Sequence, residues 1–173
     1  NRAFEVLFEP TARTALQRDW SATRDTIVLD VLDNVRNRIW VVTPAEDGWR
    51  RQEIALPSLG AASARPVDRY ASDQLFITYQ DFLTPPTLFI GAARQPVEKL
   101  KSMPSFFDAS RMTPPQLEAT SRDGTRVPYF LTAKKNLPRD GSNPTLVYGY
   151  GGFSVTTLPT YRADVPAWLE LGG

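Results

Sequence analysis

A pattern of strand-like segments that occurs twice is the feature that most restricts how this chain can fold. Apolar side chains recur at every second position, as at Ile27, Leu29 and Val31, which is the period of a half-buried strand. The segments are residues 25–32, 38–43 and 51–56 in the first copy and 73–79, 87–91 and 97–101 in the second. Asp25 and Asp73 begin the two copies, so the period is 73 − 25 = 48 residues.

A period of this length is typical of β-propeller blades, which are antiparallel sheets of roughly 40–50 residues each. A β-sandwich also contains alternating strands, and the repeat by itself favours the two folds equally. If the copies are blades, they form two consecutive four-stranded units, with Ile27 equivalent to Leu75 and Val42 to Ile90. Further expectations are a strand at residues 4–8 and packing within the blades for Trp20, Trp40 and Trp49.

The composition excludes several classes of function. The formal net charge is +1, from 20 basic and 19 acidic residues, so we expect no binding to nucleic acid or to an anionic membrane. The apolar runs are too short for a helix that spans a bilayer. The chain has neither cysteine nor histidine, which excludes disulfides and zinc–thiolate sites and leads us to expect no metal.

A short apolar segment followed by three glycines marks the C-terminal part of the chain. Thr145–Tyr148 is β-branched and apolar, which predicts a strand buried on both faces of a parallel sheet. Gly149, Gly151 and Gly152 allow positive φ angles and a close approach of the backbone to another group. In α/β-hydrolases, a glycine-rich loop after an early strand presents hydrogen-bond donors to the reacting carbonyl. A plain buried strand with a glycine turn would have the same composition.

Turn and cap residues predict two further elements. The pair Asp123-Gly124 lies between two β-type segments, 115–121 and 126–132, and therefore predicts a hairpin. A helix is expected over 164–172, with an aspartate as N-cap and a glycine at C′. The residues that define this helix are Asp164, Pro166 and Gly172, with an apolar face of Val165, Trp168 and Leu169.

Two of these segments carry a resemblance to a known family. The sequence Tyr148-Gly-Tyr-Gly-Gly-Phe153, and the Ser-x-Asp-Gly-Thr-x-x-Pro pattern at 121–128, resemble the prolyl oligopeptidase family of serine peptidases. The resemblance implies a β-propeller followed by an α/β-hydrolase domain. The fold class expected is therefore mostly β, with residues 1–104 as the last propeller blades. Residues 105–173 are expected to begin the hydrolase sheet of an incomplete two-domain protein.

The resemblance also assigns roles to two residues. Tyr150 is matched to the oxyanion hole, where its hydroxyl complements a backbone N–H, and Phe153 is matched to a wall of the proline-binding S1 pocket. Relatives specific for basic residues carry Ser-Tyr in place of the Gly-Phe seen here, so this form favours proline. Each aromatic could instead be an ordinary core residue. The implied substrates are short proline-containing peptides, cleaved on the carboxyl side of proline through an acyl-enzyme without metal or cofactor.

The catalytic residues themselves are expected outside this chain. A Ser-His-Asp triad cannot form without histidine, and Ser154 lacks the second glycine of a Gly-x-Ser-x-Gly nucleophile turn. We therefore expect an internal segment of a longer enzyme, inactive alone, whose partner is the remainder of its catalytic domain. A sibling hydrolase (basic-residue oligopeptidase, dipeptidyl or acyl-aminoacyl peptidase) and a non-catalytic β-rich interaction module remain alternatives. A cytoplasmic and a periplasmic location are both open.

Overall fold

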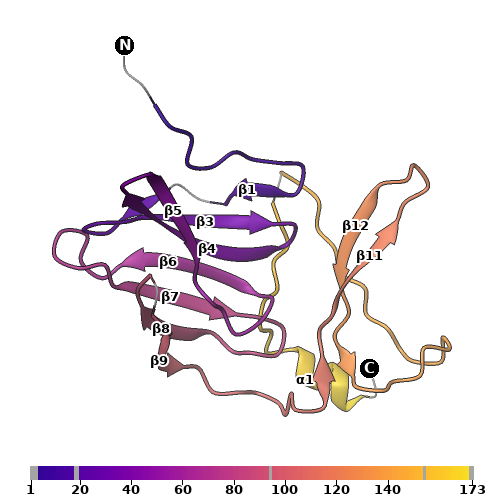
Figure 1. The fold of residues 1–173 in the computed structure, drawn as a ribbon. Helices are drawn as coiled ribbons and strands as arrows, with labels where there is room; N and C mark the ends of the chain where they lie inside the picture. Colours follow the sequence, from indigo (N-terminus) through magenta and orange to yellow (C-terminus); the bar gives the residue numbers. More distant parts are fainter. Residues whose placement is uncertain (1–3, 18–19, 94, 154, 172–173) are drawn as a thin grey trace.

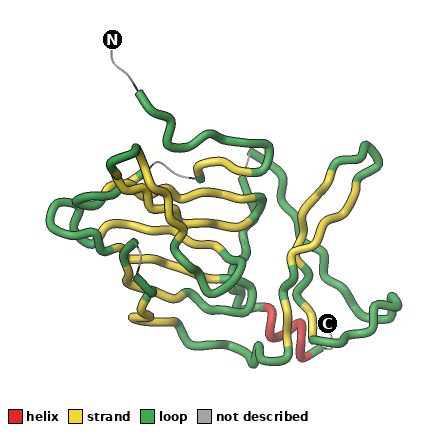
Figure 2. Tube along the Cα trace, in the orientation of Figure 1, coloured by secondary structure: helices red, strands yellow, loops and turns green. Residues whose placement is uncertain are grey.

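The computed structural model describes residues 4–17, 20–93, 95–153 and 155–171, and these are built mainly from short antiparallel strands (Figures 1 and 2). The strands of the N-terminal part are β1 (Thr14–Leu16), β2 (Ser21–Ala22), β3 (Ile27–Asp33), β4 (Arg36–Ala45), β5 (Gly48–Glu53), β6 (Ala61–Pro66), β7 (Leu75–Gln80), β8 (Thr87–Gly91) and β9 (Glu98–Ser102). The C-terminal elements are β10 (Met112–Thr113), β11 (Gln116–Thr120), β12 (Arg126–Phe130), β13 (Ala133–Lys134) and helix α1 (Val165–Glu170).

The N-terminal strands form two sheets that match the two sequence copies. The first blade has the order β1-β3-β4-β5, with β2 also paired to β3, and the second blade has the order β6-β7-β8-β9. All of these neighbours are antiparallel, and the second blade lies directly below the first in Figure 1. The prediction of two consecutive antiparallel units is therefore confirmed, with four strands in the second as predicted and five in the first, because β2 also pairs with β3.

The register shows that one of the two predicted equivalences is wrong by one residue. Ile27 and Leu75 begin the equivalent strands β3 and β7, as predicted. Their partners on the next strands are Val42 and Gly91, so Ile90 corresponds to the residue before Val42. The reason is loop length: residues 32–37 separate Val31 from its partner Arg38, whereas the longer stretch 80–86 separates Tyr79 from Thr87. The single extra residue shifts the pairing, and with it the face of each side chain.

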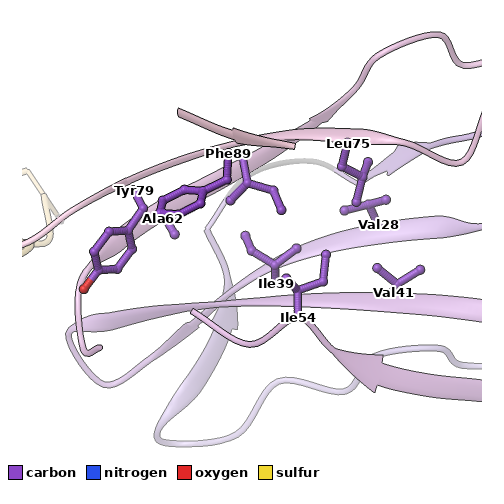
Figure 3. Close-up of a cluster of buried hydrophobic side chains, with 9 residues drawn as sticks. Val28, Ile39, Val41, Ile54, Ala62, Leu75, Tyr79 and Phe89 are labelled. Carbon is purple, nitrogen blue, oxygen red and sulfur yellow. The ribbon is translucent and has the colours of Figure 1, made fainter. Parts of the chain in front are cut away.

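A core between the two blades holds them together (Figure 3). Apolar side chains from the facing surfaces of both sheets interdigitate there, and all are almost fully buried. The members are Val28, Ile39, Val41 and Ile54 before the second blade, and Ala62, Leu75, Ile77, Tyr79 and Phe89 in it. Polar contacts add to this core. The Asp73 carboxylate of the second blade accepts bonds from the Thr23 hydroxyl (2.7 Å) and the Asp25 N–H (2.9 Å) of the first.

The N-terminal segment corrects two predictions. Residues 4–8 do not form a strand, because β1 occupies the edge of the first blade and pairs with β3. Leu7 and Phe8 instead cover the outer apolar face of that blade, with Phe8 5.8 Å from the ring of Trp40. Trp40 is half-buried beneath the Arg51 guanidinium, 4.0 Å away. The other two predicted blade tryptophans are exposed, Trp20 at 63% and Trp49 at 39%.

The predicted hairpin after the blades is confirmed. Strands β11 and β12 pair in antiparallel register and stand apart from the blades at the right of Figure 1. Gly124 has φ +85°, a left-handed conformation that suits glycine, and the Ser121 N–H donates to the Thr125 carbonyl at 2.8 Å.

Asp164 is at the N-cap of α1 as predicted, but its carboxylate binds Arg162 instead of a helix amide. The predicted C′ residue, Gly172, lies outside the described residues.

The predicted buried strand at Thr145–Tyr148 is wrong for this chain. The segment has no regular structure, and Val147 is 87% exposed. A strand needs a neighbouring backbone for its N–H and C=O groups, and the described residues provide none beside this segment.

The described residues also contain no helix that is long and apolar enough to cross a membrane.

Candidate functional site

The segment Tyr148–Phe153, called here the oxyanion loop after the role that the sequence analysis expects for Tyr150, is an exposed loop beyond the blades. Tyr150 is 50% exposed, and Phe153 is 95% exposed with φ +55°. After Phe153, the Val155 N–H donates to the Gly152 carbonyl at 3.1 Å. Both residues that the sequence singled out therefore lie on one short segment, with their side chains accessible to a partner.

The Tyr150 hydroxyl lies directly against Gly152. A methyl group on Gly152 would come within 3.0 Å of that oxygen and 3.2 Å of the carbon that bears it. A methyl group there would require the phenol to shift by a few tenths of an ångström. Of the three glycines, Gly152 alone shows the close approach that was expected: Gly149 and Gly151 have nothing within 4 Å, and none of the three has a positive φ.

Tyr148 is held by a different contact. The Arg162 guanidinium lies over its ring, 5.5 Å from the centroid, and also forms two hydrogen bonds with Asp164, at 2.9 and 2.5 Å. The bond from Arg162 keeps the pKa of Asp164 below its ordinary value, so this ion pair is charged at neutral pH. Tyr148 serves here as a surface for a cation, which differs from the role given to Tyr150.

A buried tyrosine that the sequence analysis did not identify lies a few residues further on. Tyr161 is 8% exposed, and its hydroxyl accepts a hydrogen bond from the Phe106 N–H at 2.7 Å. Its ring stacks on Phe107 at 5.4 Å with an interplanar angle of 7°. The sequence signal was the adjacent aromatic pair at 106–107 in a polar stretch, but nothing in the sequence connects this pair to a residue 54 positions later.

The other features of the described residues do not contribute to this site. An open depression of about 390 Å³ lies between the hairpin base and residues 136–145, and neither Tyr150 nor Phe153 lines it. Among the described residues, no group of acidic side chains is arranged to hold a metal ion. The most buried carboxylate of the second blade, Asp81, is occupied by bonds from Ser58, Tyr79, Leu83 and Thr84.

A five-stranded and a four-stranded antiparallel sheet that pack face to face define a segment of a β-propeller. Residues 1–100 match the family model described as prolyl oligopeptidase, N-terminal beta-propeller domain. The chain therefore belongs to the prolyl oligopeptidase family, as the resemblance predicted.

Individual relatives agree with this assignment. An uncharacterized peptidase of Sinorhizobium fredii is 41% identical over 170 residues, which is 97% of this chain and 23% of the relative. A prolyl endopeptidase of Elizabethkingia miricola is 32% identical over 123 residues, 70% of this chain and 17% of that enzyme. The structure of a post-proline cleaving enzyme from Rickettsia typhi has a TM-score of 0.78 and 31% identity, and covers 98% of this chain and 24% of its own. The chain thus spans about a quarter of the length of the relatives that it matches.

Proposed function

We propose that the whole protein is a serine peptidase that cleaves short peptides on the carboxyl side of proline through an acyl-enzyme. The observation that carries the proposal is the Tyr150 hydroxyl, set against Gly152 on an exposed loop that follows the blades of a prolyl oligopeptidase family chain. In this proposal, residues 105–173 begin the α/β-hydrolase domain and Tyr150 contributes one donor to its oxyanion hole. No metal or cofactor takes part in the proposed mechanism.

The chemistry of a phenol suits this role. A phenol in water loses its proton only near about pH 10, so a tyrosine hydroxyl can donate a hydrogen bond at neutral pH. A donor of this kind stabilises the negative oxygen that develops when a nucleophile attacks a peptide carbonyl. The general base must come from beyond these residues, since the chain contains no histidine.

Phe153 supports the proline specificity. A pyrrolidine ring is apolar and flat, and an exposed phenyl ring offers it a matching surface. The names of two relatives, a prolyl endopeptidase and a post-proline cleaving enzyme, point to the same specificity. Leu146 and Val147 are also exposed and apolar, which supports the remainder of the catalytic domain as the partner of this segment.

The test is a pair of substitutions in the full-length enzyme. Tyr150→Phe deletes the hydroxyl and keeps the ring, so we expect kcat to fall roughly 10- to 1000-fold with little change in KM. Phe153→Ala should instead raise KM, because it removes a contact made in the ground state and the transition state alike. Tyr148→Phe is the matched control, since the loss of its hydroxyl leaves the ring beneath Arg162.

Two outcomes would contradict the proposal. If Tyr150→Phe keeps kcat within twofold of the parent while the protein remains folded, the oxyanion role is wrong. A panel of chromogenic peptides with proline, lysine or an aliphatic residue before the scissile bond tests specificity. Faster cleavage after lysine or after the aliphatic residue would indicate a sibling hydrolase.

A further inference from the structure

Tyr161 joins three segments that are far apart in the sequence. Its hydroxyl lies 3.2 Å from the Ser105 hydroxyl and accepts from the Phe106 N–H, both in the stretch that leaves the second blade. Its backbone N–H donates to the side-chain oxygen of Gln80, at the end of β7, at 3.3 Å. One residue is thus bonded to the second blade and to the stretch that follows that blade.

The aromatic contacts of Tyr161 make this junction specific. Phe107 stacks almost parallel to the Tyr161 ring, and Phe106 packs at 5.6 Å with an angle of 28°. Pro159, two residues before the tyrosine, is fully buried. Tyr161 and these neighbours therefore form a packed contact, called here the junction, in a loop region that is otherwise largely exposed.

Residues close to Tyr161 in the sequence contact the oxyanion loop. Residues 155–162, called here the return segment, run from that loop past the blades toward α1 (Figure 1). Near its start, the Thr157 hydroxyl donates to the Tyr150 carbonyl at 3.5 Å. At its end, Arg162 lies over the ring of Tyr148. Both tyrosines of the oxyanion loop are thus contacted by residues within four positions of Tyr161.

We propose that Tyr161 is a positioning residue for the oxyanion loop: it fixes the return segment to the exit of the second blade, and the return segment holds Tyr150 in place. This inference rests on the proposed function, because positioning matters only if Tyr150 donates to the oxyanion. It gives the propeller a direct part in the geometry of the catalytic domain through Gln80, while Ser105 and Phe106 fix Tyr161 to the stretch that follows the second blade.

The physical reason is that a hydrogen bond to a developing charge depends steeply on geometry. A displacement of about 1 Å from a change far from the chemistry can lower a rate about 100-fold. Tyr161→Phe removes the acceptor of the Phe106 N–H and leaves that donor without its partner, so the junction loosens. The ring and its stacking on Phe107 remain, so the blades themselves are not disturbed.

A double-mutant cycle in the full-length enzyme tests the inference. We expect Tyr161→Phe to lower kcat roughly 3- to 30-fold with KM little changed, a smaller effect than loss of the oxyanion donor itself. In the Tyr150→Phe background the same substitution should have no further effect, because the hydroxyl that it positions is already absent. A purely structural role would lower activity equally in both backgrounds.

Two further variants serve as controls for the double-mutant cycle. Phe107→Leu removes the stacking but keeps the Tyr161 hydroxyl, and its effect should likewise vanish in the Tyr150→Phe background. Tyr70→Phe makes the same chemical change at an exposed position of the second blade and should leave kcat unchanged. Thermal unfolding of each variant shows whether a loss of activity is a loss of folded protein.

The outcomes separate this inference from the proposed function. An unchanged kcat for folded Tyr161→Phe, or equal losses in the two backgrounds, overturns the positioning role alone. An unchanged kcat for Tyr150→Phe overturns the oxyanion assignment and the positioning role together. If Tyr161→Phe does not fold, the cycle with Phe107→Leu decides by the same criterion.

Discussion

In the two blades, apolar side chains of one sheet meet those of the next, whereas in residues 143–158 most of the described apolar side chains lie in solvent, among them Leu146, Val147 and Val155. Ile77 is completely buried between the sheets, and Val147, which is similarly apolar and β-branched, is 87% exposed. Both were expected in buried strands. The difference is that Ile77 has paired strands on both sides and a facing sheet, and Val147 has neither among the described residues.

The comparison teaches that the two blades bury apolar side chains against each other, whereas the region that carries Tyr150 and Phe153 leaves its apolar side chains exposed among the described residues. Hydrogen bonds also join the two blades. The Asn37 side chain accepts from the Ala62 N–H at 3.0 Å, and its backbone N–H donates to the Gly60 carbonyl at 3.1 Å. The predictions below test this contrast between the two regions.

The largest expected effect concerns activity. The purified 173-residue chain should show no hydrolysis of proline-containing chromogenic peptides, because it has no histidine to act as general base. The measurement is turnover against a buffer blank, with the full-length enzyme as the positive control. Turnover that survives repurification would contradict both the mechanism and the division of roles between this chain and the rest of the enzyme.

The next prediction compares the stability cost of truncating Ile77 with that of truncating Val147. In the 173-residue chain, Ile77→Ala should destabilise the fold by about 2–5 kcal/mol, and Val147→Ala should remain within about 0.5 kcal/mol of the parent. Denaturant unfolding gives both values. In the full-length enzyme, the Val147→Ala cost should rise to about 1–3 kcal/mol as the side chain becomes buried by the catalytic domain. Equal costs in the short and full-length proteins would show that Val147 never enters a sheet.

A smaller effect is expected from two glycines. A methyl group on Gly60 would lie 2.5 Å from the Gln80 carbonyl oxygen and 2.6 Å from the Tyr79 ring, so Gly60→Ala should cost about 1–3 kcal/mol. Gly149 has nothing within 4 Å, and Gly149→Ala should leave the stability of the 173-residue chain unchanged. Thermal unfolding of the two variants is the direct comparison. A neutral Gly60→Ala would mean that the sheets are less closely packed than described.

The smallest effect is a dependence on pH. Burial alone would raise the pKa of Asp81, but hydrogen bonds from Ser58, Tyr79 and the turn amides hold that pKa below its ordinary value. A carboxylate with a depressed folded pKa stabilises the protein above its unfolded pKa, and the stabilisation is lost as the pH falls through the folded value. The stability advantage of the parent over Asp81→Asn should therefore be constant near neutrality and shrink below about pH 4.

The control for this prediction lies in the hairpin, outside the blades. Asp123 has a lowered pKa through local bonds to Thr125 in the exposed hairpin turn, so Asp123→Asn should leave the stability of the blades nearly unchanged. Urea unfolding between about pH 3 and 7 measures both variants. An advantage over Asp81→Asn that does not change with pH would show that Asp81 acts only through packing.

The sequence alone determined the repeated blades, the Asp123-Gly124 hairpin and the family, and it singled out Tyr150 and Phe153, whose roles stay predictions. These features depend on local signals: a period of two along each strand, turn residues, and a short specific motif. Local signals do not report which backbone pairs with which. For that reason the strands expected at 4–8 and at Thr145–Tyr148 were wrong, as was the equivalence of Val42 and Ile90.

Only the tertiary structure decided how distant segments meet. The contact of Tyr161 with Phe106 and Gln80 joins residues 55 and 81 positions apart, and no periodicity or motif encodes it. The same holds for the approach of the Tyr150 hydroxyl to Gly152, which depends on the path of the loop backbone. Long-range contacts follow from the joint packing of all the elements, because each side chain lies where the neighbouring sheets and loops leave space for it.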